Sequence, residues 1–139
     1  DKNYAFVIGD FNNWQPTDEG YMNQTPDGKH FWVQISNLIP KKEYVFQYFI
    51  NGQIRIGDPY ADKVSDPWND QYISNETYPD LIQYPAGKTN GIATVLQTDQ
   101  TPYSWQIASF TPSAKEHLTV YELLIRDFID KHDFTTLKD

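Results

Sequence analysis

The chain has 139 residues, enough for one small domain with a buried core and too few for two large ones. Aromatic residues make up 16% of it, which argues against disorder, because disordered chains are poor in large rings. Nineteen acidic residues against eleven basic ones give a net charge of -8. Nucleic acids and anionic membrane surfaces are bound largely through Lys and Arg, so this charge disfavours both as partners.

Three features that the sequence lacks further limit the kinds of protein and of site to be considered. There is no Cys, which excludes a disulfide, a thiolate zinc site and a cysteine nucleophile. No apolar run approaches the roughly 20 residues of a membrane-spanning helix. The sequence begins at Asp1 without a Met and enters a strand pattern almost at once, so we expect it to be a piece of a longer protein.

The first half of the chain predicts short antiparallel strands joined by turns. Residues 4–8 form an apolar run, and the turn-forming residues 9–13 follow it. In 31–35 and in 44–50, large apolar side chains recur at every second position, which is the period of a strand. The second of these strands divides into two faces, one made of Tyr44, Phe46, Tyr48 and Ile50 and the other of Val45, Gln47 and Phe49.

The pair Asn51-Gly52 predicts a hairpin turn of two residues, since both central residues of a type I′ turn need positive φ. Residues 54–57 then predict the returning strand. From residue 59 to 90 the chain is rich in Pro, Asp, Asn and aromatic residues, which indicates an irregular segment wrapped over a surface. Residues 92–96 predict one further strand.

The end of the chain has a different pattern. Residues 118–125 are apolar at consecutive positions, as in a strand that is covered on both faces of a sheet, although a helix stays open as an alternative. Residues 133–137 predict a loop entering a helix, with Thr135 or Asp133 as its cap.

No catalytic or metal-binding constellation stands out. His132 lies beside two Asp residues, a pattern that a solvated strand end explains better than a metal pair. A group of oxygen-bearing side chains lacks the spacing of a calcium-binding loop: Asp62, Asp66, Asn69 and Asp70. We therefore expect no metal ion and no other cofactor.

Four stretches of the first half match a known pattern in order and spacing: Gly-Asp-Phe-Asn-Asn-Trp at 9–14, Phe31-Trp32, the strand and Asn-Gly turn at 44–52, and Asp-Pro-Tyr-Ala at 58–61. Together they resemble carbohydrate-binding module family 48, an early-set domain. In many enzymes of glycoside hydrolase family 13, including α-amylase relatives and branching enzymes, this domain precedes the catalytic barrel. The resemblance implies a mainly β chain that folds as an immunoglobulin-like antiparallel β-sandwich.

The end of the chain carries a second resemblance. Residues 120–128 and 133–137 look like the first strand and following helix of the family 13 barrel. Three parts are then implied: a β-sandwich at 1–75, an irregular connector at 76–117 similar to that of Bacteroides-type members, and the start of a truncated (β/α)8 barrel at 118–139. Since the family's catalytic aspartate and glutamate would follow residue 139, this chain is expected to be a non-catalytic part of an α-glucan-active enzyme.

Glucan-binding members of the family stack sugar rings on exposed Trp side chains, while amides and Lys reach the hydroxyls. The resemblance carries this role to Trp14, and to Gln47 at a position where the family has Lys. A second family Trp is replaced by Ile54. Asn69 corresponds to a family Asn, and Trp68 beside it is a substitute ring. With two of the positions changed, any glucan affinity is expected to be weak and to depend on Trp14.

Two rival functions stay open. The first is a purely structural domain that positions its own catalytic barrel and binds no sugar, with Trp14 closing the end of the sandwich. The second is a free-standing binding module, which residues 120–128 disfavour because they resemble part of a barrel.

The implied partners are the barrel and an α-glucan such as starch, glycogen or a maltooligosaccharide, and the implied compartment is secreted or periplasmic. Residues 118–125 are expected to pair with a sandwich edge or with another copy.

Overall fold

A computed structural model of the chain describes residues 2–107 and 109–138. The structure is mainly β, with antiparallel sheets and a few short helices. The described residues form two compact units, which we call the sheet unit (residues 2–73 and 81–100) and the tail unit (residues 74–80 and 101–138). Within the described residues, no helix has both the length and the apolar character needed to span a membrane.

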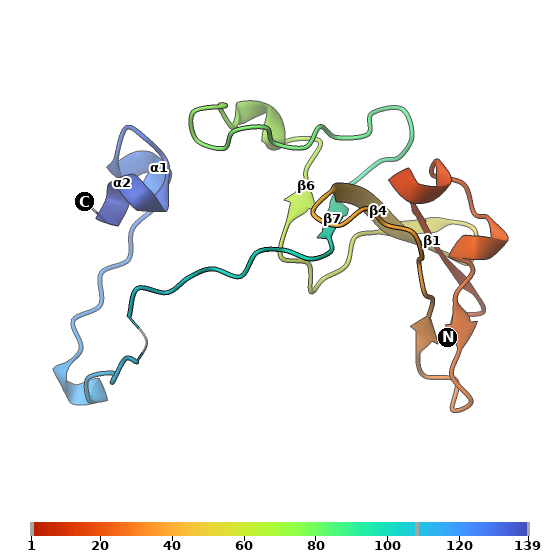
Figure 1. Cartoon of the computed structure of the whole chain (residues 1–139), viewed down its shortest axis with the longest axis horizontal. Helices are drawn as coiled ribbons and strands as arrows, with labels where there is room; N and C mark the ends of the chain where they lie inside the picture. The colour runs from red at the N-terminus through yellow and green to blue at the C-terminus, as the bar shows by residue number, and fades with distance from the viewer. Residues whose placement is uncertain (1, 108, 139) are drawn as a thin grey trace. The chain divides into compact units, whose positions relative to one another are not determined.

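The sheet unit is organised around its longest strand, β4 (Glu43–Ile50) (Figure 1). β1 (Ala5–Gly9) pairs along one edge of β4. The other edge is shared by β7 (Ala93–Gln97), which pairs with the first half of β4, and β5 (Ile54–Ile56), which pairs with its end. β6 (Val64–Ser65) pairs with β7. All these pairings are antiparallel, so the sheet agrees with the predicted strand direction.

A smaller sheet pairs β2 (Asn23–Gln24) with β3 (Phe31–Trp32), also antiparallel. Two 3-10 helices, η1 (Asp10–Asn12) and η2 (Asp18–Gly20), lie between β1 and β2 in the chain, and η3 (Asp70–Tyr72) follows β6. The smaller sheet and these turns connect the long strands of the main sheet.

The main sheet buries apolar side chains on both faces, as the alternation in β4 predicted. One face carries the Trp14 cluster: Ile8, Trp14, Val45, Ala93 and Val95. The opposite face carries the Phe46 cluster: Ala5, Val7, Met22 and Phe46, with Tyr48 and Ile50 packed against it. Phe31 and Val33, from β3 and the residues after it, also pack on the Phe46 cluster, an arrangement consistent with a β-sandwich.

The Asn51-Gly52 hairpin is one residue longer than predicted. Both residues have positive φ, 51° and 70°, and the Gln53 amide donates to the Ile50 carbonyl at 3.1 Å, as in a type I′ turn. The ladder, however, resumes only with the pair Ile50 and Ile54, so the connection holds three residues rather than two. Asn51 is tied down from outside the hairpin, because its Oδ1 accepts the Asn3 amide at 2.9 Å.

Strand β3 is shorter than the sequence pattern. Alternation predicted a strand over 31–35, but the ladder covers only Phe31–Trp32, because its partner β2 is two residues long. A strand ladder needs a hydrogen-bonding neighbour at every residue, and the alternating residues after Trp32 have none in the described part of the chain.

The sheet unit extends beyond residue 75, where the sequence predicted the end of the sandwich. Residues 81–100 belong to it, because β7 is a central strand of the main sheet and lies within the segment predicted as a connector. The return of the chain from a long irregular segment to an interior strand is a long-range pairing that local sequence patterns do not specify.

The tail unit holds no strand in its described residues. It contains η4 (Lys115–His117), α1 (Ile125–Phe128) and α2 (Phe134–Lys138). The strand predicted over 118–125 is therefore wrong for this structure: no ladder includes it, and Ile125 begins a helix. The helix predicted near 133–137 is present, and Asp133 caps it by accepting the Thr136 amide at 2.7 Å.

Candidate functional site

The structure places Trp14 in the core. Only 2% of its surface is exposed, and both Asn13 and Trp14 have positive φ, which is uncommon for a bulky side chain. Trp14 Nε1 donates to Asp10 Oδ1 at 3.0 Å, and Asp10 Oδ2 accepts the Val45 amide at 2.8 Å. The Asp10 carboxylate thus fixes the indole against β4, and the ring has no exposed face on which a sugar can stack.

Gln47 is also buried, with no exposed surface, on the same face of β4 as Val45. Its Nε2 donates to the carbonyls of Asn90 and Ile92, both at 2.9 Å, and its Oε1 accepts the hydroxyl of Thr89. Every polar atom of the amide is therefore used inside the protein. Gln47 holds the segment before β7 onto the sheet rather than facing a ligand.

The segment that covers this face runs from residue 81 to residue 92. Ile82 and Tyr84 pack on the Trp14 cluster, and the Tyr84 hydroxyl donates to the Gly91 carbonyl at 2.9 Å. Arg55 from β5 adds two bonds, from Nη1 to the Lys88 carbonyl and to the Thr89 hydroxyl, both at 3.2 Å. Burial raises the pKa of Tyr84, consistent with a ring that lies partly inside the protein.

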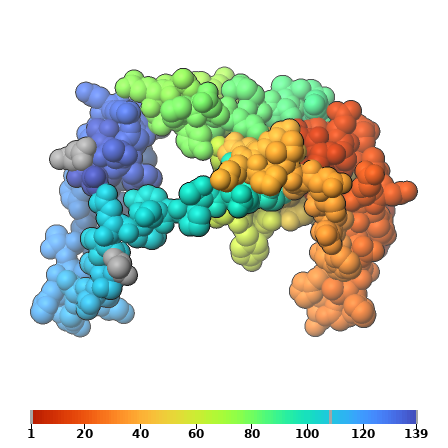
Figure 2. Space-filling model, viewed as in Figure 1, coloured from red at the N-terminus to blue at the C-terminus, as the bar shows by residue number. Residues whose placement is uncertain are grey.

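Trp68 and Asn69 lie in the opposite situation, on an exposed loop between β6 and η3, which Figure 2 shows in green at the surface. The Trp68 side chain is 59% exposed. The loop is nevertheless held in place by Asp66, whose Oδ1 accepts the amides of Trp68 and Asn69 at 2.8 and 3.1 Å, and whose Oδ2 accepts Asn69 Nδ2 at 2.7 Å. None of these three bonds uses the side-chain oxygen of Asn69.

The charge state of Asp66 follows from this geometry. The bond from the Asn69 side chain, followed by the Trp68 amide, lowers the pKa of Asp66 below its usual value. The carboxylate is therefore ionised at neutral pH and keeps accepting both amides. In the sequence, Asp66 stands out only as one of several oxygen-bearing residues. Gln71 was not predicted from the sequence, and its Nε2 donates to the Trp68 carbonyl at 2.8 Å.

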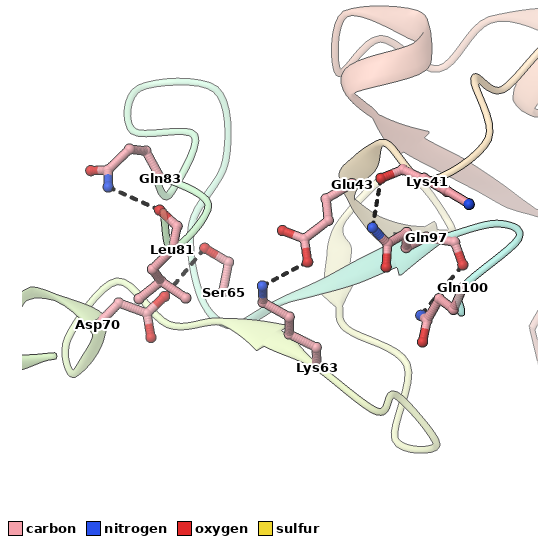
Figure 3. A network of polar contacts seen from close by, with 9 residues as sticks. All are labelled: Lys41, Glu43, Lys63, Ser65, Asp70, Leu81, Gln83, Gln97 and Gln100. Atoms are coloured by element: carbon pink, nitrogen blue, oxygen red, sulfur yellow. Dashed lines mark hydrogen bonds and ion pairs between the residues drawn. The ribbon is translucent and has the colours of Figure 1, made fainter. Parts of the chain in front are cut away.

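A second group of polar contacts anchors the base of this loop to the main sheet (Figure 3). Asp70 Oδ2 accepts the Asp66 amide at 2.8 Å and lies 3.5 Å from the hydroxyl of the buried Ser65. Lys63, the residue before β6, forms an ion pair with Glu43 of β4 at 2.7 Å. The exposed indole therefore rests on a loop that is fixed at both its turn and its base.

The structure thus divides the four sequence-predicted residues into two pairs. Trp14 and Gln47 serve the packing of one sheet face, while Trp68 and Asn69 lie together on the exposed loop. No hydrogen bond or ring contact in the described residues joins the two pairs. An exposed indole beside an amide and a carboxylate has the chemistry of a carbohydrate platform, since the ring takes the C–H face of a sugar and the polar groups take hydroxyls.

Within residues 2–107 and 109–138, no three His, Asp or Glu side chains are grouped as they would be around an ion.

A scan of the chain against models of known protein families gives no match, and a search of curated proteins finds none that is similar.

Proposed function

We propose that this chain is the non-catalytic N-terminal region of an α-glucan-active enzyme of glycoside hydrolase family 13, and that it binds α-glucan weakly through Trp68 and Asn69. The proposal takes the immunoglobulin-like sandwich and the barrel start from the sequence resemblance. The mainly β structure, with the smaller sheet packed on the main one, supports the sandwich. The observation that carries the binding proposal is the exposed Trp68 ring on a loop fixed by Asp66.

A preformed platform lowers the entropy lost on binding, because the loop does not need to order when the sugar arrives. One ring contributes only about 0.5–1.5 kcal/mol, a small part of the roughly 4.1 kcal/mol that a dissociation constant of 1 mM requires, so binding no tighter than about 1 mM is expected. The intact enzyme would use such a contact to hold polymeric substrate near its barrel. Weak single contacts gain strength on a polymer that presents many equivalent sites.

The test is a calorimetric titration of the full chain with maltoheptaose. We expect Trp68→Ala to weaken binding about 2- to 10-fold, the range of one stacking contact. Trp105→Ala is the matched control, because this Trp is also exposed, at 78%, and lies in the tail unit. Equal binding by the wild type and Trp68→Ala would remove the site from this loop.

A purely structural role is the second candidate, and the burial of Trp14 and Gln47 favours it. Both residues stand where the resemblance implied sugar contacts, yet both are used in packing the protein's own segment 81–92. Under this alternative the wild type releases no binding heat at about 10 mM maltoheptaose, about tenfold above the tightest constant expected. The titration therefore separates the two functions directly.

A further inference from the structure

Two Asn-Gly pairs lie in the sheet unit, Asn51-Gly52 and Asn90-Gly91. An Asn that precedes Gly is prone to lose its side-chain amide, because no side chain shields the glycine nitrogen from the neighbouring carboxamide. The reaction requires the Asn side chain and the next backbone amide to rearrange into a ring. The local structure therefore decides which of the two pairs can react.

The Asn51 side chain is held in place. Its Oδ1 accepts the amides of Asn3 and Tyr4, at 2.9 and 3.3 Å, and the Asn51 amide donates to the Tyr4 carbonyl at 3.1 Å. The Tyr4 side chain also lies close to the following residue, since a methyl group on Gly52 would lie 2.7 Å from the Tyr4 hydroxyl oxygen. Ring closure at Asn51 therefore requires these bonds to break and the Tyr4 side chain to move.

The Asn90 side chain has no such restraint. Asn90 is exposed, and neither its Oδ1 nor its Nδ2 has a hydrogen-bond partner in the part of the chain that the structure describes. The Gly91 amide donates to no carbonyl among the same residues. A methyl group on Gly91 would have only Gln47 Nε2 near it, at 4.0 Å, so the space beside this backbone is open. The Asn90 carboxamide can approach the Gly91 nitrogen without giving up a hydrogen bond of its own.

We propose that Asn90 is a site of spontaneous deamidation and that Asn51 is protected from it. The Gly91 nitrogen attacks Asn90 Cγ, the bond between Cγ and Nδ2 breaks, and the proton of the Gly91 amide leaves with the amine as ammonia. The product is a cyclic imide, which one water molecule opens. Addition of water at Cγ gives aspartate, and addition at the backbone carbonyl carbon gives isoaspartate. The net reaction converts one amide and one water into one carboxylic acid and one ammonia, with no oxidant or reductant.

The place of Asn90 in the fold gives this reaction a structural consequence. Its backbone carbonyl and that of Ile92 both accept Nε2 of the fully buried Gln47, each at 2.9 Å. In isoaspartate the main chain gains one methylene, and the former carbonyl becomes a carboxylate beside the chain. The spacing to Ile92 then changes, so one buried amide can no longer bind both groups with good geometry. Deamidation at Asn90 should therefore loosen the segment 81–92 from the Trp14 cluster.

The test compares the rates of deamidation at the two sites within one chain. The full chain is incubated at mildly alkaline pH, with and without denaturing guanidinium, and its peptides are followed by mass spectrometry for the gain of one mass unit. In the native chain we expect Asn90 to react at least about tenfold faster than Asn51. In guanidinium the ratio should fall to within about twofold, because the contacts that protect Asn51 are lost. Denaturation is the matched control, since it removes the structure and keeps the sequence.

Asn90→Gln tests the ring closure, because the longer side chain closes the corresponding ring much more slowly. This variant should show no mass gain at position 90 and an unchanged rate at Asn51. In the aged wild type, the amides of 89–92 should exchange hydrogen at least about tenfold faster than in the fresh protein. Asn90→Gln, aged in the same way, should show no such change.

Equal rates at the two sites of the native chain overturn the proposal. A native chain in which only Asn51 reacts, or in which neither site reacts, overturns it as well. Aspartate without isoaspartate at position 90 contradicts attack by the Gly91 nitrogen, because opening of the imide gives both products. Unchanged hydrogen exchange at 89–92 in the aged wild type contradicts the loosening of the segment.

Discussion

Trp14 and Trp105 are the same residue type in opposite surroundings, 2% exposed in the sheet unit and 78% exposed in the tail unit. In the sheet unit, β4 brings side chains from distant parts of the chain onto both of its faces, and the segment 81–92 returns to cover one of them. The tail unit has comparable apolar segments but no described buried residue. An apolar sequence becomes a core only where a second layer is available to cover it.

The largest expected difference between the two units is in hydrogen exchange at low protein concentration. β4 is hydrogen-bonded to neighbouring strands along both of its edges, so its amides become accessible only when most of the sheet unit unfolds. They should therefore exchange at least about 1,000-fold more slowly than unprotected amides. In the tail unit, the described residues of 101–113 make no backbone hydrogen bond and should exchange almost freely. Slow exchange of the amides in 101–113 would contradict the difference between the two units.

Trp14→Ala should have the next largest effect. It removes a buried indole from the Trp14 cluster and is expected to lower the free energy of unfolding by about 3–5 kcal/mol, measured in urea. Trp105→Ala serves as the control, with a change within about 0.5 kcal/mol because the ring is exposed. A loss for Trp14→Ala as small as that expected for Trp105→Ala would show that Trp14 is not a core residue in solution.

Gln47→Leu sharpens the comparison within the sheet unit. It keeps the volume but leaves the Asn90 and Ile92 carbonyls and the Thr89 hydroxyl without their partner, so the free energy of unfolding should fall by about 1–3 kcal/mol. Faster hydrogen exchange in 89–92 should accompany the loss. Gln100→Leu, at an exposed position, should leave both quantities unchanged.

The smallest expected effect concerns pH. Burial, followed by the 2.9 Å hydrogen bond to Asp58, raises the pKa of Tyr48 to about 12. The unfolded chain releases this proton near pH 10, so the contribution of Tyr48 is complete below about pH 10 and is lost as the pH rises through about 12. Urea midpoints at about pH 9 and about pH 11 should fall less for Tyr48→Phe than for the wild type. An equal fall in both proteins would contradict the assignment.

The sequence by itself determined the elements whose signals are local. Alternation in 44–50 predicted β4 and its two buried faces, because a pleated strand turns successive side chains to opposite sides. Residues 92–96 predicted β7 to within one residue. Asn51-Gly52 predicted positive φ at both turn positions, since few other residues tolerate that conformation.

Only the tertiary structure decided which of the predicted residues are exposed. Trp14 and Gln47 read as sugar contacts by resemblance, yet the segment 81–92 packs on their face and Asp10 draws the indole inward. Strand patterns at 33–35 and 118–125 likewise produced no ladder, because a strand exists only beside a partner and none is supplied by the described residues. Side-chain periodicity is written into neighbouring residues, whereas burial and pairing depend on segments far apart in the chain.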